Sequence, residues 1–132
     1  MANEAVILEL SGQNPVNFTC IDNINISKGA LLKLSGDYSV ANSSAAGVFA
    51  GIAAVDKVAN SGETKIAAYV PGQGNIFDIA NASTGTITLG GIVTLSGANV
   101  VRQALEAEMV TGAVVGKALE AAAAGETIRV IV

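Results

Sequence analysis

Two glycine-bounded apolar segments decide the fold: Gly29-Ala-Leu-Leu-Lys-Leu-Ser-Gly36 and Gly90-Gly-Ile-Val-Thr-Leu-Ser-Gly97. Each is short, aliphatic and closed by residue types that favour turns, which is typical of a β-strand. The whole chain follows this pattern, because 15 glycines divide its 132 residues into short runs. We therefore predict an all-β fold, a small barrel or sandwich. A parallel α/β sheet would need crossovers of about a dozen residues or more between strands.

The apolar runs between the turns give the expected elements. Three stretches, residues 55–60, 102–109 and 117–124, are predicted to form single helical turns at most, since isolated helices below about 12 residues are marginal. Eight strands are predicted, at residues 6–10, 30–34, 48–54, 64–70, 76–79, 92–95, 113–115 and 127–132.

The two halves of the chain repeat one another. Besides the opening pair, Gly47-Val-Phe-Ala-Gly-Ile-Ala53 matches Gly112-Ala-Val-Val-Gly-Lys-Ala118, and Gly62-Glu-Thr64 matches Gly125-Glu-Thr127. The order is kept and the offset stays between 61 and 65 residues. We predict a duplicated β-unit, at about residues 29–70 and 90–132, whose halves share one core in a single domain over residues 1–132. Residues 1–15 precede the repeat as an N-terminal arm or as a further strand.

Composition and charge limit the partners. The chain has 7 basic and 11 acidic residues, a net charge of −4, and no Lys/Arg cluster, so nucleic acid is not an expected partner. No apolar run approaches the roughly 20 residues of a membrane span, and the first residues do not resemble a signal peptide. We expect synthesis in the cytoplasm and no contact with a membrane.

The residues of catalysis are missing. There is no His, and Cys20 is the only cysteine, so a His general base and a thiolate metal cluster are both excluded. The segment from Gly112 to Ala118 has three residues between its glycines, where a phosphate-binding loop needs four. We expect no enzyme, no cofactor and no metal, and we read Cys20 as a small apolar side chain. A hydrolase or lyase built on distant carboxylates remains a rival that would require an acidic cleft.

Five glycine-centred motifs occur in a recognisable order. The chain resembles the small capsid cement, or head decoration, proteins of tailed viruses of bacteria and archaea over nearly its whole length, from about Val16 to Val132. The motifs are Ile26-Ser-Lys-Gly-Ala-Leu-Leu-Lys-Leu34, Phe49-Ala-Gly-Ile-Ala-Ala54, Gly74-Asn-Ile-Phe-Asp-Ile79, Val115-Gly-Lys-Ala-Leu-Glu120 and Gly125-Glu-Thr-Ile-Arg-Val130.

This resemblance implies a structural virion protein on the capsid exterior. Its partner would be the major capsid protein, which it would reinforce after expansion of the shell, often as a homotrimer. The family has no catalytic residues to transfer. The main alternative is an adhesive β-module of a viral tail, a fibre or a cell surface.

The N-terminal segment is the candidate attachment element. Its apolar residues precede the repeat, and they would either add as a strand to a sheet edge of a capsid subunit or a neighbouring copy, or form an edge strand of their own fold. The candidate residues are Ala5, Val6, Ile7, Leu8, Glu9 and Leu10.

Overall fold

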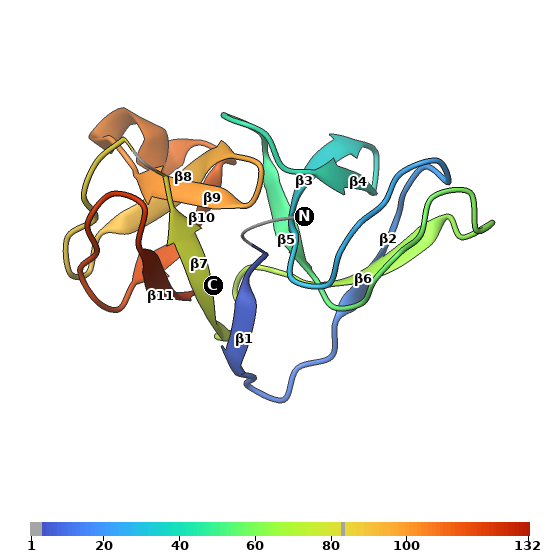
Figure 1. Ribbon diagram of the computed structural model, residues 1–132, viewed down its shortest axis with the longest axis horizontal. Coiled ribbons are helices and arrows are strands. Elements are labelled where there is room, and N and C mark those ends of the chain that lie inside the picture. The colour runs from blue at the N-terminus through green and yellow to red at the C-terminus, as the bar shows by residue number, and fades with distance from the viewer. Residues whose placement is uncertain (1–3, 83) are drawn as a thin grey trace.

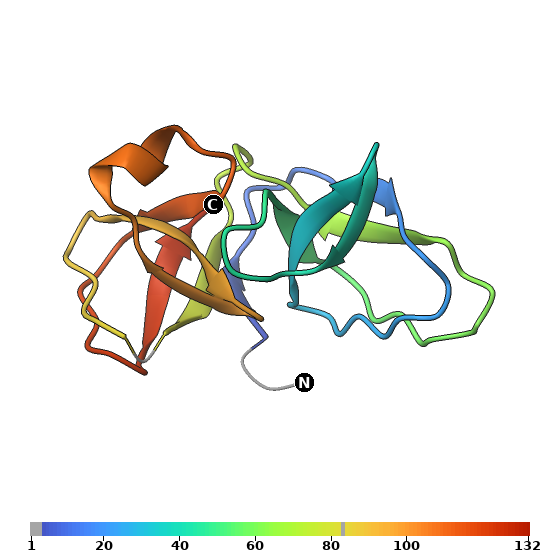
Figure 2. The ribbon, with the colours of Figure 1, turned by 90° about the horizontal axis from the view of Figure 1, so that it is seen from above.

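The computed structural model describes residues 4–82 and 84–132 and is all-β, which confirms the predicted class. Its strands form two five-stranded closed barrels that lie side by side (Figure 1). The view from above shows the same two bodies separated along the long axis (Figure 2). One 3-10 helix, η1 (Glu106–Val110), is the only helical element among the described residues.

The first barrel runs in the order β2-β4-β3-β5-β6 and closes where β6 pairs with β2. The second has the corresponding order, since β7 pairs with both β9 and β11. The first barrel consists of β2 (Val16–Thr19), β3 (Leu31–Gly36), β4 (Ser39–Asn42), β5 (Phe49–Ala53) and β6 (Lys65–Tyr69). The second consists of β7 (Ile76–Asn81), β8 (Ile92–Gly97), β9 (Val100–Gln103), β10 (Val114–Ala118) and β11 (Thr127–Ile131). The remaining strand, β1 (Val6–Glu9), adds to β7.

Matching details confirm that the halves are similar. In the first barrel an isolated bridge joins Ile26 to Lys57, and in the second a corresponding bridge joins Ile87 to Ala122. Each bridge links the loop after the first strand of its barrel to the loop before the last strand. Both barrels begin with a strand, β2 or β7, that lies upstream of the segment in which the sequence repeat is visible.

Two of the three predicted helical turns are wrong. Residues 55–60 form a loop with a β-bridge at Lys57, and in residues 117–124 the first two complete β10 while the rest form a loop with a β-bridge at Ala122. Lys57 and Ala122 use their backbone groups in the two bridges, so pairing outweighs the helix propensity of the alanines. In the third stretch, residues 102–103 end β9 and only Glu106–Val110 is helical.

The apolar residues form two clusters rather than the one shared core expected from the sequence. Leu31 and Leu32 show how they divide, because successive side chains of β3 point to opposite sides. Leu32 belongs to the core of the first barrel, while Leu31 joins the cluster of the second. Phe49 and Ile52 of β5 also join the second cluster. The first barrel therefore packs against the second barrel through side chains of β3 and β5.

Polar contacts hold the two barrels in one arrangement. The Asn99 side chain accepts the N–H of Leu31 (2.9 Å), and the Ser43 hydroxyl donates to the Gly97 carbonyl (2.9 Å). The N–H of Phe49 donates to the Gly112 carbonyl (2.7 Å). Asn99 and Ser43 are buried, so the hydrogen bonds of their side chains satisfy polar groups that are shielded from water.

Two equivalent glycines permit the tight corners of the barrels. A Cβ at Gly51 would lie 2.6 Å from the carbonyl oxygen of Tyr69, and one at Gly116 would lie 2.2 Å from that of Ile131. Both positions bring one strand backbone against another, where only a glycine fits. The register of the β10–β8 pair shifts between Val114 and Gly116, which places the bend at this residue.

We predict that Gly116→Ala destabilises the protein by roughly 2–3 kcal/mol, because the new methyl group meets backbone that cannot move aside freely. Gly85→Ala is the matched control, since a Cβ there meets nothing within 4 Å and its φ is not positive. Urea denaturation of both variants measures the effect. A Gly116→Ala variant as stable as the control would contradict the corner argument.

Candidate attachment surfaces

The predicted attachment segment is a strand of the protein's own fold. In β1, Val6 pairs with Asp78 and Ile7 pairs with Phe77 of β7. Ala5 is buried, and its N–H donates to the Gly29 carbonyl (2.7 Å). The structure therefore places Val6–Glu9 as an edge strand of the protein's own fold, flanked by Ala5 and Leu10, while the role of residues 5–10 in attachment stays a prediction.

The outward side of this strand is apolar. Val6, Leu8 and Leu10 are exposed, and Glu9 is exposed beside them. The outer edge of β1 pairs with no other strand in the part of the chain that the structure describes. A hollow of about 400 Å³ adjoins it, lined by Leu8, Glu9, Ile76, Leu119, Glu120 and Arg129. Exposed apolar side chains next to an unpaired strand edge are typical of a protein-binding surface.

A second apolar surface lies on η1, which we call the η1 knob: Leu105, Met109 and Val110. All three side chains are exposed, and Val110 is 90% exposed. The knob is absent from the first barrel, where only residues 43–48 separate β4 from β5, while residues 104–113 separate β9 from β10. An insertion whose apolar side chains face water adds nothing to the core, so its residues are available for a partner.

One ion pair anchors the knob to the barrel. The Arg102 guanidinium on β9 donates through two nitrogens to the Glu108 carboxylate, with Nη1 at 2.7 Å from Oε1. The same carboxylate accepts the N–H of Leu105 (2.8 Å), which ties down the start of the helix. These hydrogen bonds, first that from Arg102 and then that from Leu105, lower the pKa of Glu108 to about 2.

The ion pair between Arg102 and Glu108 makes a pH-dependent contribution to the stability of the fold. Because the folded pKa of Glu108 is depressed, its stabilisation is fully present above its usual pKa of 4.5 and is lost as the pH falls towards about 2. We predict that Glu108→Gln is less stable than the wild type at neutral pH and equal to it near pH 2. Urea denaturation across this range measures the difference. Glu106→Gln, in the same helix and without the bonds to Arg102, is the control, and parallel curves for wild type and Glu108→Gln would contradict the assignment.

Tyr38 is a strained residue at the outer end of the first barrel. It lies in the turn between β3 and β4 with a φ of 53°, in the left-handed region that costs bulky side chains about 1 kcal/mol or more. The equivalent position in the second barrel holds Asn99 with a φ of 61°, and Asn tolerates this region better. Tyr38 is 61% exposed, and its ring packs on that of Phe18 with the ring centroids 5.2 Å apart. An aromatic residue therefore occupies a position whose backbone favours Asn.

We predict that Tyr38→Asn stabilises the protein by up to about 1 kcal/mol, because the relief of backbone strain outweighs the lost packing of the exposed Tyr38 side chain on Phe18. Tyr38→Phe keeps the strain and is expected to match the wild type. Thermal unfolding of the two variants distinguishes them, and a Tyr38→Asn variant less stable than Tyr38→Phe would contradict this reading.

One buried cation, Lys57, joins loops of the first barrel. Lys57 is 3% exposed, and its ammonium donates to the carbonyls of Asp22 (2.8 Å) and Ile24 (3.1 Å), which holds two loops of the first barrel together. Cys20 is buried, and desolvation raises the pKa of its thiol. Within residues 4–82 and 84–132, no three His, Cys, Asp or Glu side chains gather as a metal site would need.

No family model matches the chain, and no curated protein matches it. No helix of the described residues is long and apolar enough to cross a membrane.

Sequence reasoning missed the η1 knob and Tyr38, although each leaves a signal in the repeat. The offset between the halves rises from 61 to 65 residues across the knob, which marks the insertion. When the opening segments are aligned, Tyr38 falls opposite Asn99. The exposure of the knob and the strain at Tyr38 depend on the turn geometry, which the sequence does not reveal.

Proposed function

We propose that this protein is a capsid cement protein, which binds the outer surface of a viral shell and stabilises it. The observation that carries the proposal is the order of the five glycine-centred motifs, which covers the chain from about Val16 to Val132. Several of these glycines have a structural reason to be kept. Gly51 and Gly116 form the barrel corners, and a Cβ at Gly29 would lie 2.2 Å from the Ala5 carbonyl oxygen.

The physical character of the molecule suits this role. Two small barrels with aliphatic cores and buried polar ties form a stiff body, which a reinforcing protein needs. The acidic net charge of −4 favours solubility at the high local density of a decorated shell. Two apolar surfaces, on β1 and on the η1 knob, are exposed at separate places on the molecule (Figure 1).

The proposed mechanism is multivalent. The partner is the major capsid protein, and self-association, as a homotrimer, brings several attachment surfaces to one shell. Each contact can be of moderate strength, because linked contacts raise the effective concentration of the next. A molecule that spans neighbouring shell subunits then resists their separation.

Cosedimentation with expanded empty shells tests the proposal. We predict saturable binding at a copy number tied to the capsomers, and loss of binding by at least about tenfold when Val6 and Leu8 are both changed to Ser. Both side chains are exposed, so the variant is expected to fold, whereas deletion of residues 2–10 would also remove buried Ala5 and the pairs with β7.

The matched control changes Val55 and Val58, two exposed valines of the first barrel, to Ser. It is expected to bind shells as the wild type does. Absence of saturable binding by the wild type would refute the proposed function, while equal binding by all three proteins would refute the role of β1.

A further inference from the structure

The equivalent strands β2 and β7 differ in how their edge towards β4 or β9 is paired. In the second barrel, β9 covers only the end of β7, at Ala80 and Asn81. The rest of that edge is covered by β1, which pairs antiparallel with Ile76, Phe77 and Asp78. A short closing strand and an added extended strand together complete the hydrogen bonding of this edge.

In the first barrel the corresponding part of the edge is open. There β4 meets β2 only at the pair Thr19 and Ser39. No strand of the described residues covers Val16–Phe18 on that side. Asn17 corresponds to Asp78, the residue with which Val6 of β1 pairs. The position that holds an added strand in one barrel is therefore vacant in the other.

The backbone of Asn17 faces this opening. The N–H of Thr19 turns towards β4 and donates to the Tyr38 carbonyl (3.0 Å), while the N–H of Cys20 turns the other way and donates to Thr64 (2.9 Å). Since alternate residues of a strand direct their backbone groups to the same side, the N–H and C=O of Asn17 point to the open edge.

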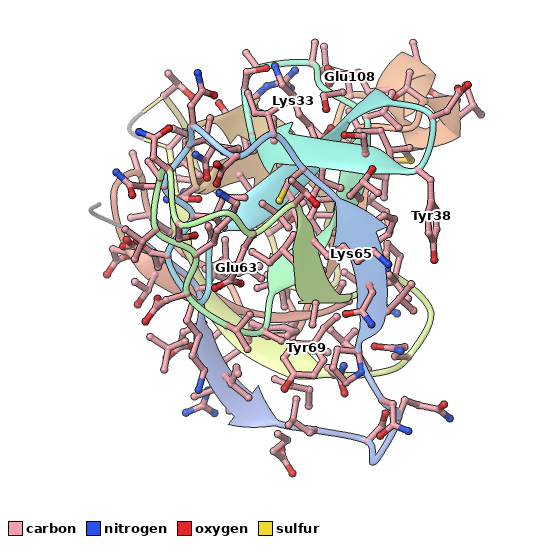
Figure 3. The ribbon with its side chains drawn as sticks, turned by 90° about the vertical axis from the view of Figure 1, so that its right-hand side faces the viewer. Lys33, Tyr38, Glu63, Lys65, Tyr69 and Glu108 are labelled. Atoms are coloured by element: carbon pink, nitrogen blue, oxygen red, sulfur yellow. The ribbon has the colours of Figure 1, made fainter. Side chains whose placement is uncertain are left out.

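A hollow of about 320 Å³ lies beside the opening, lined by Asn17, Phe18, Thr19, Tyr38 and Lys65. Tyr38 projects into solvent beside β2, with Lys65 close to the same strand (Figure 3). An exposed aromatic ring on strained backbone, next to the unpaired N–H and C=O of Asn17, is typical of a binding site.

We propose that the open edge of β2 binds an extended segment of a partner protein as an added antiparallel strand. The Asn17 backbone supplies the hydrogen bonds, Tyr38 packs on an apolar side chain, and Lys65 attracts an acidic one. The occupant is a foreign segment, because each copy already holds its own β1 through pairs with β7 and the bond from Ala5 to Gly29. That the partner is a shell subunit rests on the proposed function, whereas the open edge itself does not.

The test is a titration of ¹⁵N-labelled full-length protein with a synthetic peptide of the β1 sequence, residues 4–11, which already pairs with the equivalent edge of β7. We expect shifts and slowed amide exchange at Asn17, and weakening by at least about tenfold in Asn17→Pro, which removes the N–H that faces the opening. Asn17→Ala keeps the N–H and is expected to bind within about twofold of the wild type.

Two further variants keep the proposal testable if Asn17→Pro fails to fold. Tyr38→Asn and Lys65→Glu are both expected to weaken peptide binding, the first despite higher thermal stability. No shift at Asn17 with millimolar peptide, or shifts confined to Phe77 and Asp78, would overturn the proposal. A change of oligomeric state in Asn17→Pro would show that the occupant is a second copy and would also overturn it.

Cosedimentation with shells separates this inference from the proposed function. If the wild type binds shells and Asn17→Pro binds equally well, the edge is not the attachment site but the cement function stands. If the wild type does not bind shells but the peptide titration succeeds, the edge binds extended segments and the shell is not the partner.

Discussion

The close approach of two backbones at Gly51 and at Gly116 is the constraint on which the rest of the structure depends. A barrel of five strands, each of only four to six residues, must bend sharply to close, and each bend brings a strand into contact with a neighbouring carbonyl, at Tyr69 or Ile131. Because glycine has no side chain, the strands can come close together at the bend. The apolar side chains on either side then fill the interior of the barrel. The loops are thereby held where Asn99, Ser43 and Lys57 can satisfy buried polar groups.

The two barrels differ from one another at only a few places. Equivalent strands and bridges preserve the barrel in both halves, and the departures lie outside the cores: the η1 knob in the second half, Tyr38 in the first, and β1 on only one of two equivalent edges. Each departure exposes apolar groups or leaves backbone unpaired, which has a cost for the isolated molecule. A duplicated fold permits such changes, because one barrel keeps its geometry while the other changes. The unchanged barrel then shows where the changed barrel departs from the common structure.

Much of this fold could be predicted from glycine spacing, since runs such as residues 30–34 and 92–95 have strong apolar character and clear ends. The strands β4 and β9 were not among the predicted ones, because they are four residues long and carry polar residues such as Ser39 and Arg102. The alanine-rich residues 117–124 were misread because local propensity does not reveal the bridge from Ala122 to Ile87. Residues 5–10 were identified as a candidate from their apolar character, but their pairing with β7 depends on a contact some 70 residues away, which no local pattern encodes.

We propose that this double barrel attaches to the exterior of a viral shell through surfaces that its own fold leaves open. Cryo-electron microscopy of expanded shells mixed with saturating protein tests that claim most directly. The account predicts double-barrel density at fixed positions on the outer surface, in numbers tied to the capsomers, with a strand of shell protein beside β2. Shells that remain bare under these conditions would contradict it.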